Sequence, residues 1–260
     1  MSEVTADGYE QVGVAMTCRS FREYVDMFVL APESLPNPIL DVAAGASSFT
    51  AEAHQRGLQA VAVDPLYSHS PETIYQHGMV EIESATSKLA KLAHVYDWNY
   101  YGSIQEHEQG RLSSLRTFCK DYEQDPGHLR YVAGNLPNLP FADDMFSLVL
   151  CSHFLFLYDE QFDLQFHLDA LQDLVRVCKP GGEVLVYPLA TFKREPYPQF
   201  DELISVLKAD GRVVEQVPTT FRFLQGATHV LRISKPNEGC RDIPHLAMVT
   251  NFTNPHPTKA

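Results

Sequence analysis

Residues 37–64 constrain the fold of this chain more than any other segment. They begin with the strand-like segment Asn-Pro-Ile-Leu-Asp-Val, in which Ile, Leu and Val are apolar, and continue through a turn of small residues. They end with the apolar run Ala-Val-Ala-Val before Asp64. Two short apolar runs separated by a helix-length segment predict a parallel strand–helix–strand unit. Ligands of open α/β sheets bind outside the carboxyl ends of the strands, so we expect a ligand beside the turn and Asp64.

The turn and the acid together favour a nucleoside. Asp64 lies 23 residues after Asp41, about where such units carry the carboxylate that accepts ribose hydroxyls. A dinucleotide fingerprint has three glycines, whereas the corresponding positions here are Ala43, Gly45 and Ser48. Asp41 would repel a pyrophosphate but can accept a hydrogen bond from an ammonium group. The alternative interpretation is an ordinary strand–turn–helix that binds nothing.

Two later segments add further motifs. Residues 130–153 predict two strands joined by the short connection Gly-Asn-Leu-Pro-Asn-Leu-Pro-Phe. In this connection, Asn135 can accept a hydrogen bond from an amino group, and Leu136 suits packing on a purine. Residues 174–187 predict the end of an amphipathic helix, a Lys-Pro-Gly-Gly stop and a buried strand.

In this order, the three segments resemble class I S-adenosylmethionine-dependent methyltransferases of the small-molecule type. The first motif of that family is usually Asp/Glu-x-Gly-x-Gly-x-Gly, and Ala43 and Ser47 depart from it. The resemblance covers residues 37–65 and 130–190 and implies a Rossmann-like α/β sheet, mostly parallel with an antiparallel last strand. It also implies S-adenosylmethionine as the cofactor. The cofactor contacts that we expect are Asp41, Ala43, Gly45, Asp64, Pro65, Asn135, Leu136, Cys151 and Ser152.

The remaining patterns divide the chain into four parts. Residues 1–36 form an N-terminal segment with a flanking helix at 18–30, for which Ser20 is the expected N-cap. Residues 37–64 and 130–235 form the cofactor-binding domain, which ends in a helix at 199–209 and a hairpin. Residues 65–129 are a helical insert after the second strand, with helices near 72–95 and 104–122. Residues 236–260 are a polar, proline-rich tail.

The insert contains an aromatic segment, Tyr-Asp-Trp-Asn-Tyr-Tyr, at residues 96–101. An insert after a site-bearing strand leaves the sheet at its ligand-binding edge. We therefore expect a lid whose rings close over the sulfonium, with Tyr100 and Tyr101 as catalytic residues through cation–π contact. The alternative is that these rings only pack the insert onto the sheet.

His153 follows the fourth strand and is the acid–base residue that we predict, because a neutral imidazole can take a proton from an amine or a hydroxyl. The alternative is a histidine that is hydrogen-bonded for structure. The resemblance implies in-line methyl transfer to a small molecule. One alternative is cyclisation of S-adenosylmethionine to azetidine-2-carboxylate and methylthioadenosine, as by an azetidine-2-carboxylate synthase. A second is a nucleoside-binding protein without catalysis.

Composition excludes several partners. The chain has 33 acidic residues against 20 Lys and Arg, a net charge of −13, so we expect no nucleic-acid partner. Its five cysteines include no C-x-x-C pair, and we expect neither a disulfide framework nor a metal site. The first residues lack a secretory signal pattern, and no apolar run is long enough for a membrane. We expect a cytoplasmic enzyme, of secondary metabolism and of undetermined oligomeric state, whose partner is a small-molecule substrate or none beyond the cofactor.

Overall fold

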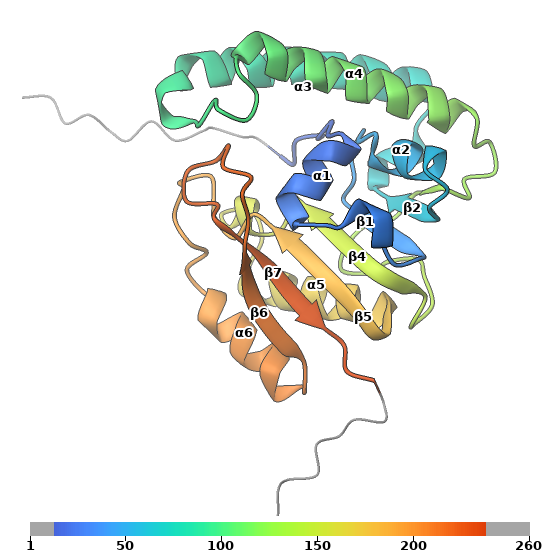
Figure 1. Ribbon diagram of the computed structural model, residues 1–260, viewed down its shortest axis with the longest axis vertical. Coiled ribbons are helices and arrows are strands. Elements are labelled where there is room, and N and C mark those ends of the chain that lie inside the picture. Colours follow the sequence, from blue (N-terminus) through green and yellow to red (C-terminus); the bar gives the residue numbers. More distant parts are fainter. Residues whose placement is uncertain (1–12, 238–260) are drawn as a thin grey trace, which may run out of the picture.

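Seven strands form one mixed sheet at the centre of the computed structural model, which describes residues 13–237 (Figure 1). The strand order is β3-β2-β1-β4-β5-β7-β6, and only β7 runs antiparallel to its two neighbours. This confirms the mostly parallel α/β sheet with an antiparallel last strand. The strands are β1 Ile39–Val42, β2 Ala60–Val63, β3 Tyr131–Val132, β4 Phe146–Ser152, β5 Cys178–Tyr187, β6 Val213–Pro218 and β7 His229–Ser234.

The order of strands reverses between β1 and β4. From β1 the chain moves outward through β2 and β3, and then returns to pair β4 with the other side of β1. In this pairing Val42 lies opposite Cys151, so the turn after β1 and the end of β4 meet at the same edge. Crevices at such reversal points are the usual ligand sites of open α/β sheets.

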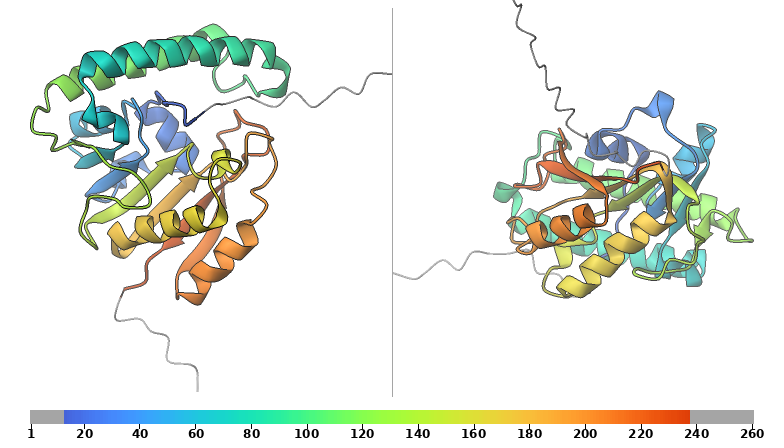
Figure 2. Two further views of the ribbon diagram at one scale, coloured as in Figure 1. Left: turned by 180° about the vertical axis from the view of Figure 1, so that it is seen from behind. Right: turned by 90° about the horizontal axis from the view of Figure 1, so that it is seen from below.

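Helices cover both faces of the sheet (Figure 2). The helices α1 (Phe21–Phe28) and α2 (Phe49–Gln55) pack on one face, and α5 (Leu164–Val177) and α6 (Phe200–Ala209) on the other. Side chains alternate along β4 accordingly, because successive residues of a strand point to opposite faces. Leu148 and Leu150 join the core beside α1, whereas Val149 and Cys151 join the core beside α5.

The first helix begins as the sequence predicts. Ser20 caps α1 by accepting a hydrogen bond from the Glu23 N–H, and the Glu23 side chain accepts one from the Ser20 N–H. This reciprocal capping box fixes the direction in which the chain enters the helix. It also places the Glu23 carboxylate in the interior, where the residue is only 5 % exposed.

The insert consists of two long helices, α3 (Pro71–Lys91) and α4 (Ile104–Glu123), close to the predicted ranges. They pack against each other and lie across the edge where the parallel strands end (Figure 1). Stacked and edge-on rings of Tyr67, Phe118, Tyr122 and Tyr131 join α4 to β3 and to the turn after β2. Short 3₁₀ helices complete the described elements: η1 Pro32–Ser34, η2 Pro65–Ser68, η3 Ala93–Val95 and η4 Phe156–Tyr158.

The Lys-Pro-Gly-Gly segment differs in part from the expected turn. Helix α5 does end at Val177, but β5 already begins at Cys178, and its pairing with β4 shifts between Phe146 and Leu148. The glycines therefore lie in an irregular stretch of the strand. Gly181 has a left-handed backbone (φ 76°), which a residue without Cβ adopts at little cost.

Parts of the sequence prediction fall outside the described residues, namely positions 1–12 and most of the proline-rich tail, with Cys240. Within residues 13–237, no helix is long and apolar enough to span a membrane. The same range contains no group of three metal-binding side chains, and its four cysteines form no disulfide.

Candidate functional site

A cavity of about 410 Å³ opens where β1, β2 and β3 end. Its walls come from the turns after these strands, from residues 14–17, and from the segment that follows β4. Leu139, Phe162 and Phe166 provide apolar surface. Six of the residues predicted from the sequence line this cavity: Ala43, Asp64, Pro65, Asn135, Leu136 and His153.

Asp64 shapes the cavity as well as lining it. Its Oδ2 accepts the Gly45 N–H at 2.9 Å, and its Oδ1 accepts the Leu66 N–H at 3.0 Å. Burial raises the pKa of this carboxyl group, while the two backbone bonds act in the opposite direction. Each carboxylate oxygen can accept more than one hydrogen bond, so Asp64 retains acceptor capacity toward a ribose.

Gly45 is required for a reason that the sequence does not show. It has φ +59°, and a Cβ there would lie 2.6 Å from the Thr17 carbonyl oxygen. The neighbouring Ala46 N–H donates to the same oxygen at 2.8 Å. Residues 15–17 therefore cover the turn, and the close approach that we expected for a ligand is made by the protein backbone. Gly45 itself does not line the cavity.

Asp41 is fully buried on β1, behind the cavity wall. The Tyr24 hydroxyl donates to its Oδ1 at 3.0 Å, whereas Oδ2 has no partner among the described residues. Burial raises the pKa of Asp41 well above its usual value; the bond from Tyr24 opposes this rise and the nearby Asp64 adds to it. An unpaired buried acceptor is costly, and a donor such as an ammonium group would satisfy it.

At the end of β4, His153 lines the cavity, whereas the two residues before it lie behind the cavity wall. Cys151 and Ser152 are buried and line neither cavity. A hydrogen bond of 2.9 Å joins Ser152 Oγ to Nδ1 of His153, and the His153 N–H donates to the Tyr187 carbonyl at 2.6 Å. His153 has a left-handed backbone (φ 53°), uncommon for a residue with a side chain. The turn thereby holds the imidazole in a fixed position.

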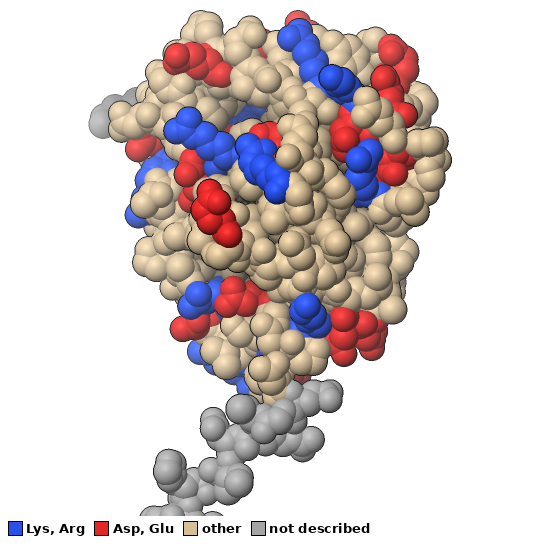
Figure 3. All heavy atoms as spheres, turned by 45° about the vertical axis from the view of Figure 1, so that its right-hand side comes forward, with Lys and Arg blue, Asp and Glu red and all other residues tan. Residues whose placement is uncertain are grey.

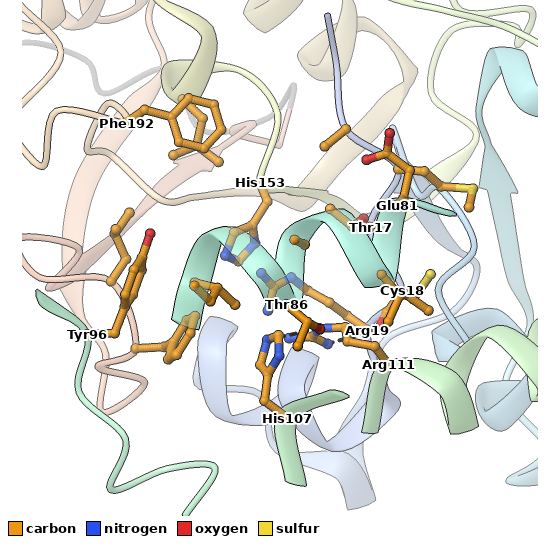
Figure 4. A pocket seen from close by; sticks show the side chains of 18 of the residues that line it. Thr17, Cys18, Arg19, Glu81, Thr86, Tyr96, His107, Arg111, His153 and Phe192 are labelled. Carbon is orange, nitrogen blue, oxygen red and sulfur yellow. Dashed lines mark hydrogen bonds between the residues drawn. The ribbon is translucent and has the colours of Figure 1, made fainter. Parts of the chain in front are cut away.

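A second, smaller cavity of about 140 Å³ adjoins the first. The two share Ala15, Met16, Thr17 and His153. The insert contributes one wall, with residues from α3 and α4, and the loop between β6 and β7 contributes another through Phe223 and Leu224. Figure 4 shows the lining, in which the side chains of Arg19 and Arg111 lie between those of His153 and His107.

A buried ionic network forms one side of this smaller cavity. The Glu23 carboxylate contacts Arg19 Nη1 at 3.2 Å and Arg111 Nη1 at 2.8 Å. The Tyr101 hydroxyl donates to Glu23 Oε1 at 2.5 Å and accepts from Arg111 Nη2 at 2.7 Å. Burial raises the pKa of Tyr101 to about 12, so its hydroxyl remains a donor. Although burial opposes ionisation of Glu23, Arg111 and Arg19 hold the pKa of its carboxyl at about 2.

Both histidines of the smaller cavity are neutral. Burial, together with the positive charges of Arg111 and Arg19, lowers the pKa of His107 to about 2. The same causes, with Arg19 ahead of Arg111, place the pKa of His153 well below its usual value. His107 Nε2 accepts from Arg111 Nε at 3.3 Å, and its Nδ1 has no partner within the described part of the chain.

Tyr100 and Tyr101 lie outside both cavities. The Tyr100 hydroxyl donates to Asp26 Oδ2 at 2.7 Å, and Tyr101 belongs to the Glu23 network. Trp98 also packs behind the cavity, where its Nε1–H donates to the Ala93 carbonyl at 2.8 Å. Of the aromatic segment, only Tyr96 reaches the smaller cavity, and its ring stacks on Phe223 at 4.8 Å.

Sequence reasoning missed Arg19 and Arg111 and ranked His107 only as a weaker acid–base candidate than His153. In the sequence, Arg111 is one of several charged residues in the helix predicted near 104–122. Its signal was the four-residue spacing from His107, which places both on one helical face with the apolar Leu115. Nothing local indicates that this face meets Glu23, 88 positions earlier in the chain.

Comparison with known proteins identifies a domain within this chain. A methyltransferase-domain family model matches residues 111–186. An uncharacterized protein of Methanocaldococcus jannaschii is 31 % identical over 218 residues, which cover 84 % of this chain and 94 % of that protein. A ubiquinone/menaquinone biosynthesis C-methyltransferase of Legionella pneumophila is 38 % identical over 64 residues, 25 % of this chain and 23 % of that enzyme. The chain contains a methyltransferase domain and is an S-adenosylmethionine-dependent methyltransferase.

Some solved structures of methyltransferases are also similar to this chain. The glycopeptide N-methyltransferase MtfA has a TM-score of 0.45 at 14 % identity, with 83 % of this chain and 94 % of that chain covered. A putative S-adenosyl-L-methionine-dependent methyltransferase of Methanococcus maripaludis has a TM-score of 0.42 at 12 % identity, with 84 % of both chains covered.

The cofactor of this methyltransferase is S-adenosylmethionine, and the residues present fit it. We propose that Asp64 holds the ribose hydroxyls, Asn135 and Leu136 the adenine, and Asp41 the ammonium group. The fit rests on the volume of the larger cavity and on Asp64 and Asn135, which line it. Asp41 does not line this cavity, and its proposed contact rests on its unpaired Oδ2 alone.

Replacing Asp64 by alanine should weaken binding of S-adenosylhomocysteine by about 1–3 kcal/mol, because hydrogen bonds to a charged acceptor contribute about that much. Calorimetry on the purified variant measures the change, and thermal melting without ligand shows whether the Gly45 turn remains folded. The matched control is Asp210→Ala, at an exposed acid on the far end of α6. Unchanged affinity in Asp64→Ala would remove Asp64 from the cofactor site.

The contribution of Glu23 to the free energy of unfolding should decrease as the pH becomes acidic. The pKa of Glu23 is about 2 in the fold against an ordinary value of 4.5, so its contribution is complete above pH 4.5 and is lost as pH falls toward 2. The difference corresponds to roughly 3 kcal/mol. The gap in free energy of unfolding between wild type and Glu23→Gln should therefore shrink between pH 6 and about pH 3. Glu33→Gln, at an exposed position, should show no such change; a gap independent of pH contradicts the ionised network.

Proposed function

We propose that this methyltransferase transfers the methyl group to a small molecule held in the smaller cavity. The observation that carries the proposal is that this cavity and the cofactor cavity share His153 and residues 15–17. Its volume of about 140 Å³ is below the roughly 300–1,000 Å³ of drug-sized ligand pockets, which favours a compact acceptor.

S-adenosylmethionine supplies a methyl group on a sulfonium, which is a good leaving group. The protein then contributes orientation and exclusion of water. Residues 15–17 and the insert enclose the junction of the two cavities, and Leu157, Phe192 and Phe223 provide apolar surface on the acceptor side. This arrangement suits a reaction in which the acceptor must be aligned and desolvated.

His153 is placed to remove a proton from the acceptor. Burial, Arg19 and Arg111 lower its pKa well below the usual value, which keeps the ring neutral but makes it a weaker base, so its role rests on its position between the two cavities. When Nδ1–H donates to Ser152 Oγ, Nε2 keeps a free lone pair that can take a proton from an amine or a hydroxyl. The fixed backbone of His153 makes it the acid–base candidate that the geometry favours.

The structure bears on the alternative reactions and partners. Cyclisation of the cofactor needs no acceptor, and the smaller cavity would then have no function. A nucleic-acid substrate is also disfavoured, since Lys and Arg are interspersed with Asp and Glu on the face drawn in Figure 3. A cytoplasmic enzyme of small-molecule metabolism is the setting that we propose.

Transfer can be tested with methyl-labelled S-adenosylmethionine and a cellular extract separated into small-molecule and macromolecular fractions. We expect the label in a low-mass product, together with S-adenosylhomocysteine. His153→Asn should lower turnover by about 10²-fold, since asparagine tolerates a left-handed backbone but cannot act as a base. His69→Asn, at an exposed turn, is the control. Methylthioadenosine alone would indicate cyclisation, and label in the macromolecular fraction would overturn a small acceptor.

We also propose that α3 and α4 act as a lid over the junction of the cavities. Residues of both helices line the smaller cavity, and Trp98 lies between them, with its ring against Phe223 at 5.3 Å. Since Trp98 is the only tryptophan, its emission should shift when S-adenosylhomocysteine binds, and amide exchange in 71–123 should slow. Asp64→Ala at the same ligand concentration is the control. If saturating ligand changes neither the Trp98 emission nor the amide exchange of residues 71–123, the insert is packed rigidly on the sheet and does not act as a lid.

A further inference from the structure

The smaller cavity carries an unbalanced positive charge. Two guanidinium groups, those of Arg19 and Arg111, share the single carboxylate of Glu23. His107 and His153 beside them are neutral. All of these groups are largely withdrawn from solvent, and the side chains of Arg19 and Arg111 are only 10 % and 9 % exposed. One positive charge therefore remains uncompensated at this end of the cavity.

Arg19 is the group with unused donors. Arg111 uses four of its five N–H donors, toward Glu23, Tyr101, His107 and the Cys18 carbonyl. Arg19 makes its hydrogen bonds through Nη1 alone, and its Nε is buried without a partner among residues 13–237. In Figure 4 the side chain of Arg19 lies next to His153, a residue that both cavities share.

The other acid of this cavity does not neutralise Arg19. Glu81 on α3 lines the cavity, but its carboxylate pairs with His77 at 3.6 Å, and its side chain is 27 % exposed. In Figure 4 its carboxylate lies apart from Arg19, beside the N-terminal segment. Much of the remaining lining is apolar, with Ile82, Leu157 and Phe223 among its side chains, although Thr86 and Tyr158 also line the cavity.

We propose that Arg19 binds the carboxylate of the methyl acceptor, so that the substrate class is a small carboxylic acid with an apolar body. This inference rests on the proposed transfer to a small molecule. A guanidinium matches a carboxylate in shape and forms charge-assisted hydrogen bonds with it. One uncompensated charge matches a monoanion, whereas a phosphate monoester would bring close to two negative charges.

The network behind Arg19 has a positioning role. Glu23 holds Nη1 of Arg19 from one side and Arg111 from the other, and the Tyr101 hydroxyl bridges all three side chains. The arginine is therefore fixed before the substrate arrives, and little side-chain entropy is lost on binding. The carboxylate anchors one end of the acceptor while its nucleophilic group faces His153.

The test measures binding and does not require the natural acceptor. With saturating S-adenosylhomocysteine, calorimetry compares phenylacetate with phenylacetamide and hexanoate with hexanamide, pairs that differ in charge but little in size. We expect at least one acid to bind about tenfold or more tightly than its amide, since charge-assisted hydrogen bonds contribute about that much. Arg19→Gln should abolish this preference. Arg22→Gln, an exposed arginine three residues away, should retain it.

A second arm identifies the source of the carboxylate. Affinities of Arg19→Gln for S-adenosylhomocysteine and methylthioadenosine should both stay within about twofold of wild type. Weaker binding of S-adenosylhomocysteine alone would assign Arg19 to the amino-acid part of the cofactor and overturn the proposal. The absence of any acid-over-amide preference in the wild type overturns it too, even if the variant fails to fold.

Different results would contradict methyl transfer to a small molecule and carboxylate binding by Arg19. If acids bind selectively but labelled methyl groups reach only macromolecules, or methylthioadenosine is the only product, the proposed small-molecule transfer fails. If a low-mass product forms and the acceptor proves to be neutral or cationic, transfer stands and the carboxylate site is wrong.

Discussion

The buried carboxylate of Glu23 is the interaction on which the rest of the site depends. It closes the capping box of α1, and it pairs with Arg19 from the preceding segment and with Arg111 from the insert. Removing a charged group from water costs free energy unless its partners replace the lost hydration, and here three side chains do so. One residue thus ties the first helix, the N-terminal segment and the insert together at the edge of the sheet.

Much of the fold could be predicted because its signals are local. The apolar runs at β1 and β2, the Lys-Pro-Gly-Gly stop and Ser20 with Glu23 each specify an element from a few neighbouring residues. The cofactor side of the site follows from the same locality: Asp64 and Asn135 end strands that the topology brings to one edge. The strand order alone therefore predicts that residues at the strand ends lie close together, although they are distant in sequence. No knowledge of side-chain contacts is needed for this prediction.

The acceptor side could not be predicted because it is assembled from tertiary contacts. Arg19, Arg111 and His107 each look like ordinary polar residues in sequence, and their burial depends on how the insert packs over the sheet. Gly45 shows the same limit, since its missing Cβ makes room for the Thr17 backbone and not for a ligand. The aromatic segment illustrates the converse: its rings suggested a direct role, but Tyr101 reaches the cavity only through Glu23 and the two arginines.

The two cavities therefore differ in how their charges are arranged. On the cofactor side, Asp64 lines the cavity with a carboxyl group, and Asp41 lies behind the wall with its Oδ2 unpaired among the described residues. On the acceptor side, Arg19 leaves an unbalanced positive charge beside neutral His153. In a site of low dielectric, such fields discriminate between ligands of opposite charge more strongly than in water. A cationic cofactor and an anionic acceptor would each be directed to its own side, with the imidazole at the boundary between them.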